Sequence, residues 1–108
     1  MRRLPAHLLL TTALAVATTA ANAEDHVVVQ KDRSFSTAEI TIRRGDRVVF
    51  RNEDTRTHNV FSRTPGSAFE IKAQIPGQTA AIGFPESGRA DVRCAIHPNM
   101  KLTVNVEP

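Results

Sequence analysis

Apolar and polar residues alternate along most of this chain beyond its first quarter, and this alternation constrains the fold more than any other feature. The alternating segments are residues 26–30, 39–43, 47–52, 80–84, 88–94 and 100–106. A period of two places every second side chain on one face, which is typical of half-buried antiparallel β-strands. Gly45-Asp46 fits a tight hairpin turn with glycine first. About seven short strands predict an all-β Greek-key sandwich of two sheets.

The first 23 residues have the features of a secretory signal peptide. Two arginines at positions 2–3 precede an apolar run over 8–21, and Ala21-Asn22-Ala23 has the small-x-small pattern of a cleavage site. The run of about 14 residues is short for a membrane span, so no membrane anchor is expected. We predict cleavage after Ala23, an exported domain over residues 24–108, and a periplasmic location in a bacterium.

Charge and cysteine content exclude several classes of function. Lys and Arg number 14 against 11 Asp and Glu, for a net charge of +3, and two of the arginines belong to the predicted leader. The remaining charges are interspersed, so no basic footprint for nucleic acid is expected. A single cysteine excludes an internal disulfide and every zinc site that needs two or more cysteines.

A thiol, an imidazole and a thioether follow one another at a spacing of three near the end of the chain. The segment is Cys94-Ala95-Ile96-His97-Pro98-Asn99-Met100. Pro98 disfavours a helical His97, so this segment is predicted to be a loop between two strands. Thiolate and thioether are soft donors and imidazole suits both copper and zinc, so the thioether of Met100 favours copper.

The donor set of a blue-copper site has two histidines, one cysteine and a weak axial methionine. Since the loop supplies only His97, a second histidine must come from elsewhere. After cleavage the candidates are His26 and His58, and His58 follows the predicted strand 47–52 closely. We therefore expect His58 to complete the site.

On these residues the chain resembles a cupredoxin of the plastocyanin and amicyanin branch over Val27–Val106. The resemblance rests on Val48-x-Phe50-x-Asn52, His58-Asn59-Val60 and Cys94-x-x-His97-x-x-Met100, and the short last motif is more similar to amicyanin. It implies one copper ion cycling between Cu(I) and Cu(II), with equatorial ligands His58, Cys94 and His97 and axial ligand Met100. It also implies that Asn59 ties the two ligand-bearing segments together.

The resemblance implies a monomeric one-electron carrier rather than an enzyme. Its partners would be redox proteins (a dehydrogenase, a c-type cytochrome or an oxidase) in brief contact around His97. A copper carrier or buffer with the same ligands is the alternative. A cysteine enzyme using Cys94 and His97 is a third class, but it would leave Met100 without a role.

The predicted mature terminus, Glu24-Asp25-His26, raises the prospect of a second metal site. A free amine, two backbone amides and an imidazole in third position can hold Cu(II) in a square plane. The alternative is that His26 simply begins the first strand.

Overall fold

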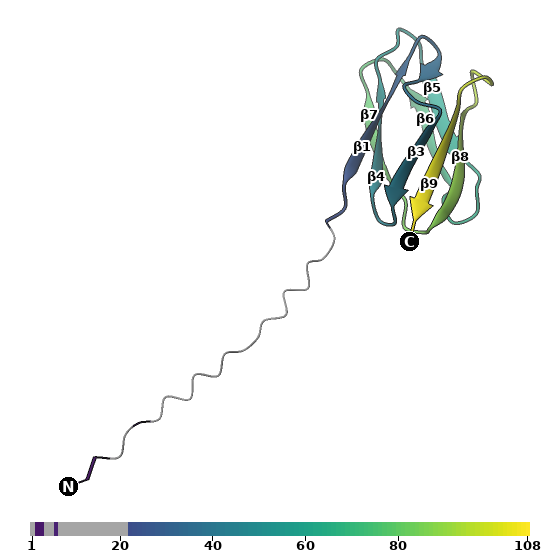
Figure 1. The fold of residues 1–108 in the computed structure, drawn as a ribbon. Helices are drawn as coiled ribbons and strands as arrows, with labels where there is room; N and C mark the ends of the chain where they lie inside the picture. The colour runs from purple at the N-terminus through teal and green to yellow at the C-terminus, as the bar shows by residue number, and fades with distance from the viewer. Residues whose placement is uncertain (1, 4–5, 7–21) are drawn as a thin grey trace.

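The computed structural model describes residues 2–3, 6 and 22–108, so the predicted leader lies almost wholly outside the described residues. The described part forms nine strands (Figure 1): β1 Asp25–Lys31, β2 Ser34–Phe35, β3 Glu39–Arg43, β4 Arg47–Asn52, β5 His58–Ser62, β6 Phe69–Gln74, β7 Thr79–Gly83, β8 Gly88–Cys94 and β9 Lys101–Glu107. Among these residues, no helix is long and apolar enough to cross a membrane.

The strands form two sheets that pack face to face, as Figure 1 shows. One sheet has the order β2-β1-β4-β7 and the other has the order β3-β9-β8-β5-β6. Only the pairs β1–β2, β5–β6 and β8–β9 join consecutive strands, so the remaining neighbours arise from crossovers between sheets. The predicted all-β, two-sheet Greek-key sandwich is confirmed, with nine strands instead of about seven.

Two details of the predicted topology are wrong. Strand β1 pairs with β4, and β3 pairs with β9, in parallel rather than antiparallel register. Gly45-Asp46 makes a tight turn but not a hairpin, because β3 and β4 belong to different sheets. Gly45 is the third residue of that turn, with φ of 91°, and the Asp46 N–H donates to the carbonyl of Arg43 at 3.0 Å. The turn therefore carries the chain from one sheet to the other, and the buried residues of β3 and β4 face the core from opposite sheets.

The core lies between the sheets and comes largely from the alternating segments that the sequence identified. In β1 the alternation predicted Val27 and Val29 on the inner face, which is wrong because Val28 is buried instead; Val60 lies on β5, outside those segments. The buried apolar residues are Val28, Ile42, Val48, Phe50, Val60, Phe84, Ala90, Val92, Leu102, Val104 and Val106. The Phe50 ring is fully buried and packs near two others, with the Phe35 and Phe69 rings at centroid distances of 6.3 and 5.8 Å. Burial of such side chains is the main source of stability in a small domain.

A buried amide cluster, consisting of Gln30, Asn52 and Gln74, joins the two sheets at one end of the core. The Gln30 Nε2 donates to the Gln74 Oε1 at 2.7 Å, and the Gln74 Nε2 donates to the carbonyl of Phe50 at 2.9 Å. The Asn52 Nδ2 donates to the carbonyl of Gln74 at 2.8 Å. Gln74 pairs with His58 across β5 and β6, so these amides fix the sheets beside His58.

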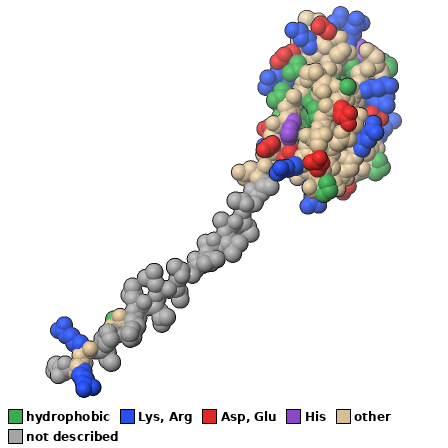
Figure 2. All heavy atoms as spheres, in the orientation of Figure 1, with side chains coloured by type: hydrophobic (Ala, Val, Ile, Leu, Met, Phe, Trp, Pro, Cys, Tyr) green, Lys and Arg blue, Asp and Glu red, His purple; other side chains and the backbone are tan. Residues whose placement is uncertain are grey.

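The surface carries mixed charge. Basic and acidic side chains are interspersed over the face that Figure 2 shows. Several of them pair, as in Arg47 with Asp25 at 2.6 Å and Arg93 with Asp91 at 2.8 Å. Exposed pairs of this kind contribute little to stability.

Candidate metal centre

The sulfur of Cys94 and the ring of His58 meet because their strands are neighbours. His58 is the first residue of β5 and Cys94 is the last residue of β8, and Val60 pairs directly with Cys94. The β5–β6 register shifts between His58 and Val60. The extra residue lies on β6, since three steps of β6 oppose two of β5, while His58 and Val60 are both buried by ordinary alternation along β5. Two strand ends of one sheet thus present a thiol and an imidazole to the same small volume.

The loop between β8 and β9 adds the third side chain, His97. Its first residue, Ala95, donates its N–H to the carbonyl of Asn59 at 3.1 Å, which ties the loop to β5. The Met100 N–H donates to the carbonyl of His97 at 3.0 Å, and this closes a turn with Pro98 in its second position. Proline presets the backbone angle that this turn position requires. The predicted non-helical loop is therefore present, and it is anchored at both ends.

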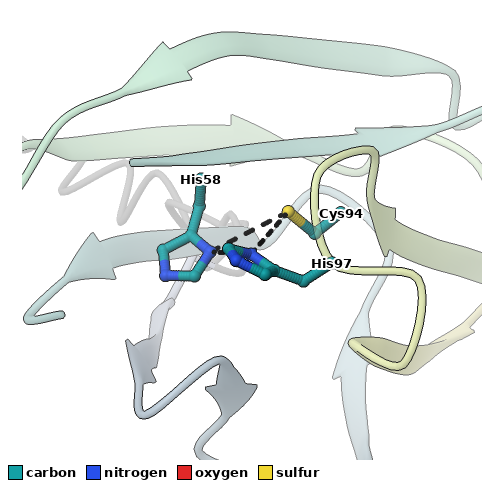
Figure 3. A group of neighbouring side chains, drawn as sticks. All are labelled: His58, Cys94 and His97. Atoms are coloured by element: carbon teal, nitrogen blue, oxygen red, sulfur yellow. Dashed lines mark hydrogen bonds between the residues drawn. The ribbon is translucent and has the colours of Figure 1, made fainter. Parts of the chain in front are cut away.

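Three donor atoms converge in this arrangement, as Figure 3 shows. The Cys94 Sγ lies 3.8 Å from the His58 Nδ1 and 3.8 Å from the His97 Nδ1, and the two Nδ1 atoms are 3.1 Å apart. A point equidistant from these three atoms lies about 2.1 Å from each, close to the roughly 2.0–2.3 Å of imidazole and thiolate bonds to zinc, a neighbouring first-row metal. The three side chains therefore fit a single metal ion of this size.

Met100, the fourth predicted residue, is 1% exposed and ends the same loop. Its backbone bond to His97 fixes it at the base of that loop, where it precedes β9. A buried thioether beside two imidazoles and a thiolate makes the environment soft, which suits copper.

A buried carboxylate fixes the orientation of His58. The His58 Nε2 lies 2.9 Å from the Asp54 Oδ2, and the exposed fractions of the two side chains are 0% and 3%. Because an ionised carboxylate can only accept a hydrogen bond, the His58 Nε2 carries the hydrogen and donates it to Asp54, and Nδ1 presents its lone pair toward Cys94 and His97. Metal-binding histidines use a carboxylate in this way to set the tautomer and raise the basicity of the ligand.

Asp54 is itself held by several donors. The backbone N–H groups of Arg33 and Thr55 donate to its carboxylate at 2.9 and 2.7 Å, and the Arg56 guanidinium lies 3.4 Å away. The Arg33 N–H, together with the bond to His58, holds the pKa of Asp54 well below its usual range against the opposing effect of burial. Asp54 is therefore ionised at neutral pH and acts as a fixed negative charge behind His58.

The Arg33 N–H reaches Asp54 because the β1–β2 turn has a left-handed backbone. Asp32 and Arg33 have φ of 51° and 56°. Positive φ at both central residues is the geometry of a two-residue type I′ hairpin, which asparagine and glycine normally provide. A bulky residue in this region is strained.

His97 lies at the boundary between the site and the surface. Burial is the main reason that its pKa is lowered, and the facing His58 ring contributes to the same effect. Both effects favour the neutral imidazole, which is the form that binds a metal ion. The ring is half-buried, while the adjoining Ile96 is 52% exposed.

Asn59 ties the two ligand-bearing segments mainly through its backbone. Its N–H donates to the Cys94 Sγ at 3.4 Å, and its carbonyl accepts the Ala95 N–H. The side-chain Nδ2 instead donates to Glu70 at 3.4 Å on β6, and its Oδ1 is buried without a partner among the described residues. The expected link between the segments is therefore present, made by the backbone of Asn59 and not by its side chain.

His26 lies apart from this group. It belongs to β1, and its Nε2 lies 2.9 Å from the Asp46 Oδ2. The three side chains that the structure groups, His58, Cys94 and His97, are among the four expected from the sequence; Met100 stays a predicted ligand, and Asp54 was missed. The sequence does place an acidic residue four positions before His58. That spacing alone does not predict a contact, because the loop between the two residues decides whether their side chains meet.

A small β-sandwich that holds two imidazoles and a thiolate together, with a buried methionine adjoining, belongs to the class of mononuclear copper proteins. The family model of the cupredoxin-like domain matches residues 5–106. The chain is a member of the cupredoxin-like family, as the resemblance in its motifs indicated, and its cofactor is one copper ion.

The chain is also similar to several amicyanins. It is 34% identical to amicyanin-alpha of Methylorubrum extorquens over 68% of this chain, and 34% identical to amicyanin of Paracoccus versutus over 77% of this chain. The matches cover 64% and 66% of the lengths of these curated relatives. The solved structure of the P. versutus amicyanin superposes with a TM-score of 0.70 at 33% identity, covering 81% of this chain and 83% of that one.

Proposed function

We propose that this chain is an exported one-electron carrier whose copper is held by His58, Cys94 and His97, with Met100 as a weak axial ligand. The observation that carries the proposal is the triangle of one sulfur and two Nδ1 atoms, whose dimensions suit a single ion of this size. Similarity to the amicyanins supports it. Copper supplies a one-electron couple between Cu(I) and Cu(II).

The protein's contribution is a donor set whose positions are fixed before any electron moves. Asp54 orients His58, the Asn59 N–H supports the sulfur of Cys94, and the turn from His97 to Met100 fixes the loop. Because these contacts hold the donors in one arrangement, little rearrangement is needed when the charge at the site changes. Low rearrangement is what a fast electron carrier requires.

Electrons would enter and leave through the loop around His97. His58 and Cys94 are 0% and 3% exposed, whereas His97 is half-buried and Ile96 is largely exposed beside it. A small apolar contact of this kind suits brief encounters with a redox protein such as a dehydrogenase, a c-type cytochrome or an oxidase. The same burial leaves Cys94 poorly placed to attack a substrate, which argues against a cysteine enzyme.

The export part of the proposal rests on the leader-like sequence. Cleavage after Ala23 would release residues 24–108, which contain every strand of the sandwich. A periplasmic location would follow in a bacterium. The mass of the mature protein, isolated from cells expressing the whole chain, tests this directly.

The deciding experiment is visible absorption and EPR spectroscopy of the copper-loaded mature protein. We expect an intense visible band from charge transfer between the Cys94 thiolate and copper. Cys94→Ser and His97→Ala should abolish or strongly change the band, whereas His26→Ala, a histidine remote from the centre, should leave it unchanged. A blue Cys94→Ser protein would refute the assignment.

A copper carrier or buffer with the same ligands predicts a different outcome. Such a protein hands its ion to an acceptor, so its copper should move readily to a chelator or acceptor protein. The burial of His58 and Cys94 favours retention instead. Repeated reduction and oxidation with full retention of copper would support the electron carrier, and rapid loss of Cu(I) would support the copper carrier.

A further inference from the structure

A second group of metal-binding side chains lies at the start of β1, away from the copper centre. Glu24, His26 and Asp46 each place one donor atom so that the three atoms lie within 4.8 Å of one another. Glu24 directly precedes β1 and His26 is the second residue of β1. The two are two positions apart in extended chain, so their side chains share a face. Asp46 immediately precedes β4, whose parallel pairing with β1 brings it opposite them.

The Asp46 carboxylate is the centre of this group. Its Oδ1 accepts the Glu24 backbone N–H at 3.0 Å, and its Oδ2 lies 2.9 Å from the His26 Nε2. The Arg43 N–H also donates to Oδ2, at 3.0 Å. The exposed fractions of the His26 and Asp46 side chains are 29% and 6%, so the imidazole is reachable from solvent while the carboxylate is nearly buried.

The nitrogen of Glu24 changes its chemistry if the leader is removed after Ala23. In the precursor it is an amide, which has no lone pair available for a metal. In the mature chain it becomes the terminal amine, held beside the Asp46 carboxylate. The mature protein then offers an amine, an imidazole and two carboxylates within one small region.

We propose that the mature chain binds a second divalent cation here, through the Glu24 amine and carboxylate, the His26 imidazole and the Asp46 carboxylate. Nitrogen and oxygen donors of this kind suit Cu(II), Ni(II) and Zn(II), with Cu(II) bound most tightly. The two carboxylates give the group a charge of about −2 when the amine and imidazole are neutral, which complements a dication. The site goes beyond the proposed electron carriage but relies on the proposed cleavage after Ala23.

Three arginines lie near this group, so its two carboxylates must attract a cation against their charge: Arg43 and Arg44 border the adjoining cavity, and Arg47 lies on β4. Arg47, the nearest basic residue along β4, is engaged by Asp25 at 2.6 Å. Asp25 lies between Glu24 and His26 and so points to the opposite face of the strand. In the uncleaved chain a cavity of about 70 Å³ adjoins the group; Asn22 and Ala23 line it together with Glu24, Asp46 and the turn over residues 43–45, so cleavage after Ala23 would open it further.

This site differs from the backbone chelate that the terminal sequence alone suggests. A square-planar chelate would use the amides of Asp25 and His26, yet both residues pair with β4 in the sheet, with Arg47 and Val48 respectively. The structure gives His26 a side-chain partner, Asp46, instead. The two arrangements can therefore be separated by a substitution at Asp46.

The test is a titration of Cu(II) into the mature protein whose blue site is already filled, followed by EPR and calorimetry. We expect one further equivalent with a tetragonal EPR signal and an unchanged blue band. His26→Gln should weaken this second binding at least tenfold, and the uncleaved chain should lack it. Asp91→Asn, which removes an exposed carboxylate on β8 in the other sheet, is the matched control and should bind normally.

Three results would overturn the site. They are absence of a second equivalent in the mature protein, equal binding by His26→Gln and Asp91→Asn, and a mature chain that begins at a residue other than Glu24. Full binding by an Asp46→Asn protein that keeps its blue band would assign the ion to the backbone chelate. Because the blue band is recorded in every sample, failure of this site and failure of the proposed copper centre are distinguishable.

Discussion

Replacement of Asp54 by asparagine tests the role of the carboxylate behind His58. Asparagine has nearly the same shape, but one of its two terminal atoms is a donor instead of an acceptor. In the structure both carboxylate oxygens face donors: Arg33 and His58 at Oδ2, and Thr55 at Oδ1. Either orientation of the amide therefore loses at least one bond to a charged acceptor in a buried position.

Hydrogen bonds to charged groups contribute about 1.5–3 kcal/mol each, so we expect the free energy of unfolding of the metal-free protein to fall by about 2–4 kcal/mol. In a domain of this size that corresponds to a decrease in Tm of roughly 10–25 °C. The measurement is denaturant unfolding of the metal-free Asp54→Asn protein. Asp91→Asn is the matched control, because the exposed pair with Arg93 should change stability by no more than about 0.5 kcal/mol.

The same substitution should raise the reduction potential. The Asp54 charge stabilises the more positive Cu(II) state through His58, and a preference of about 1–2 kcal/mol corresponds to roughly 40–90 mV for a one-electron couple. Voltammetry of the copper-loaded variant measures this shift. If Asp54→Asn unfolds at the same denaturant concentration as Asp91→Asn and keeps the wild-type potential, the carboxylate does not act on His58 as argued.

Three further predictions concern other parts of the molecule. Met100→Leu should keep a coloured copper site but raise its potential, because leucine has no lone pair to support Cu(II); an unchanged potential in voltammetry would place Met100 outside the centre. The pKa of Asp46 is lowered from 3.8 to about 2, chiefly by the Glu24 N–H and by the bonds from His26 and Arg43. A lowered pKa stabilises the fold above pH 4, and this contribution is lost as the pH falls from about 4 toward 2, so unfolding midpoints measured across that range should depend on pH less in Asp46→Asn than in the wild type. Arg33→Gly should raise the free energy of unfolding by about 0.5–1 kcal/mol, since glycine adopts its φ of 56° without strain and keeps the N–H for Asp54; a lower denaturation midpoint would contradict this.

The period-two pattern allowed most of the fold to be predicted from the sequence. It identified the buried faces of β4, β8 and β9, whose residues Phe50, Val92 and Val104 are all fully buried. It could not identify β2, which has only two residues, or β6, whose inward face is only partly buried. Nor could it give strand partners, because alternation shows which side chains are buried but not which strand lies alongside. The pairing of β3 with β9 illustrates this, since they are separated by most of the domain.

The candidate centre was predictable because cysteine, histidine and methionine are all scarce in this chain, and one of each lies within the seven residues 94–100. His58 was found by elimination among few histidines, and the structure places its Nδ1 beside Cys94. Asp54 was not predictable from the sequence. Its role depends on the β1–β2 turn that brings the Arg33 N–H to it, and no residue pattern near position 54 reports that contact.

The amide cluster of Gln30, Asn52 and Gln74 has a consequence for how this molecule fluctuates. Each of these side chains is at most 1% exposed, and together they join strands of both sheets next to His58. Separating the sheets at that end would leave several amides without partners, so transient opening should begin at the opposite end. Backbone hydrogens of the adjoining strand residues 50–52 and 58–60 should consequently exchange with deuterium most slowly, even before any ion is added.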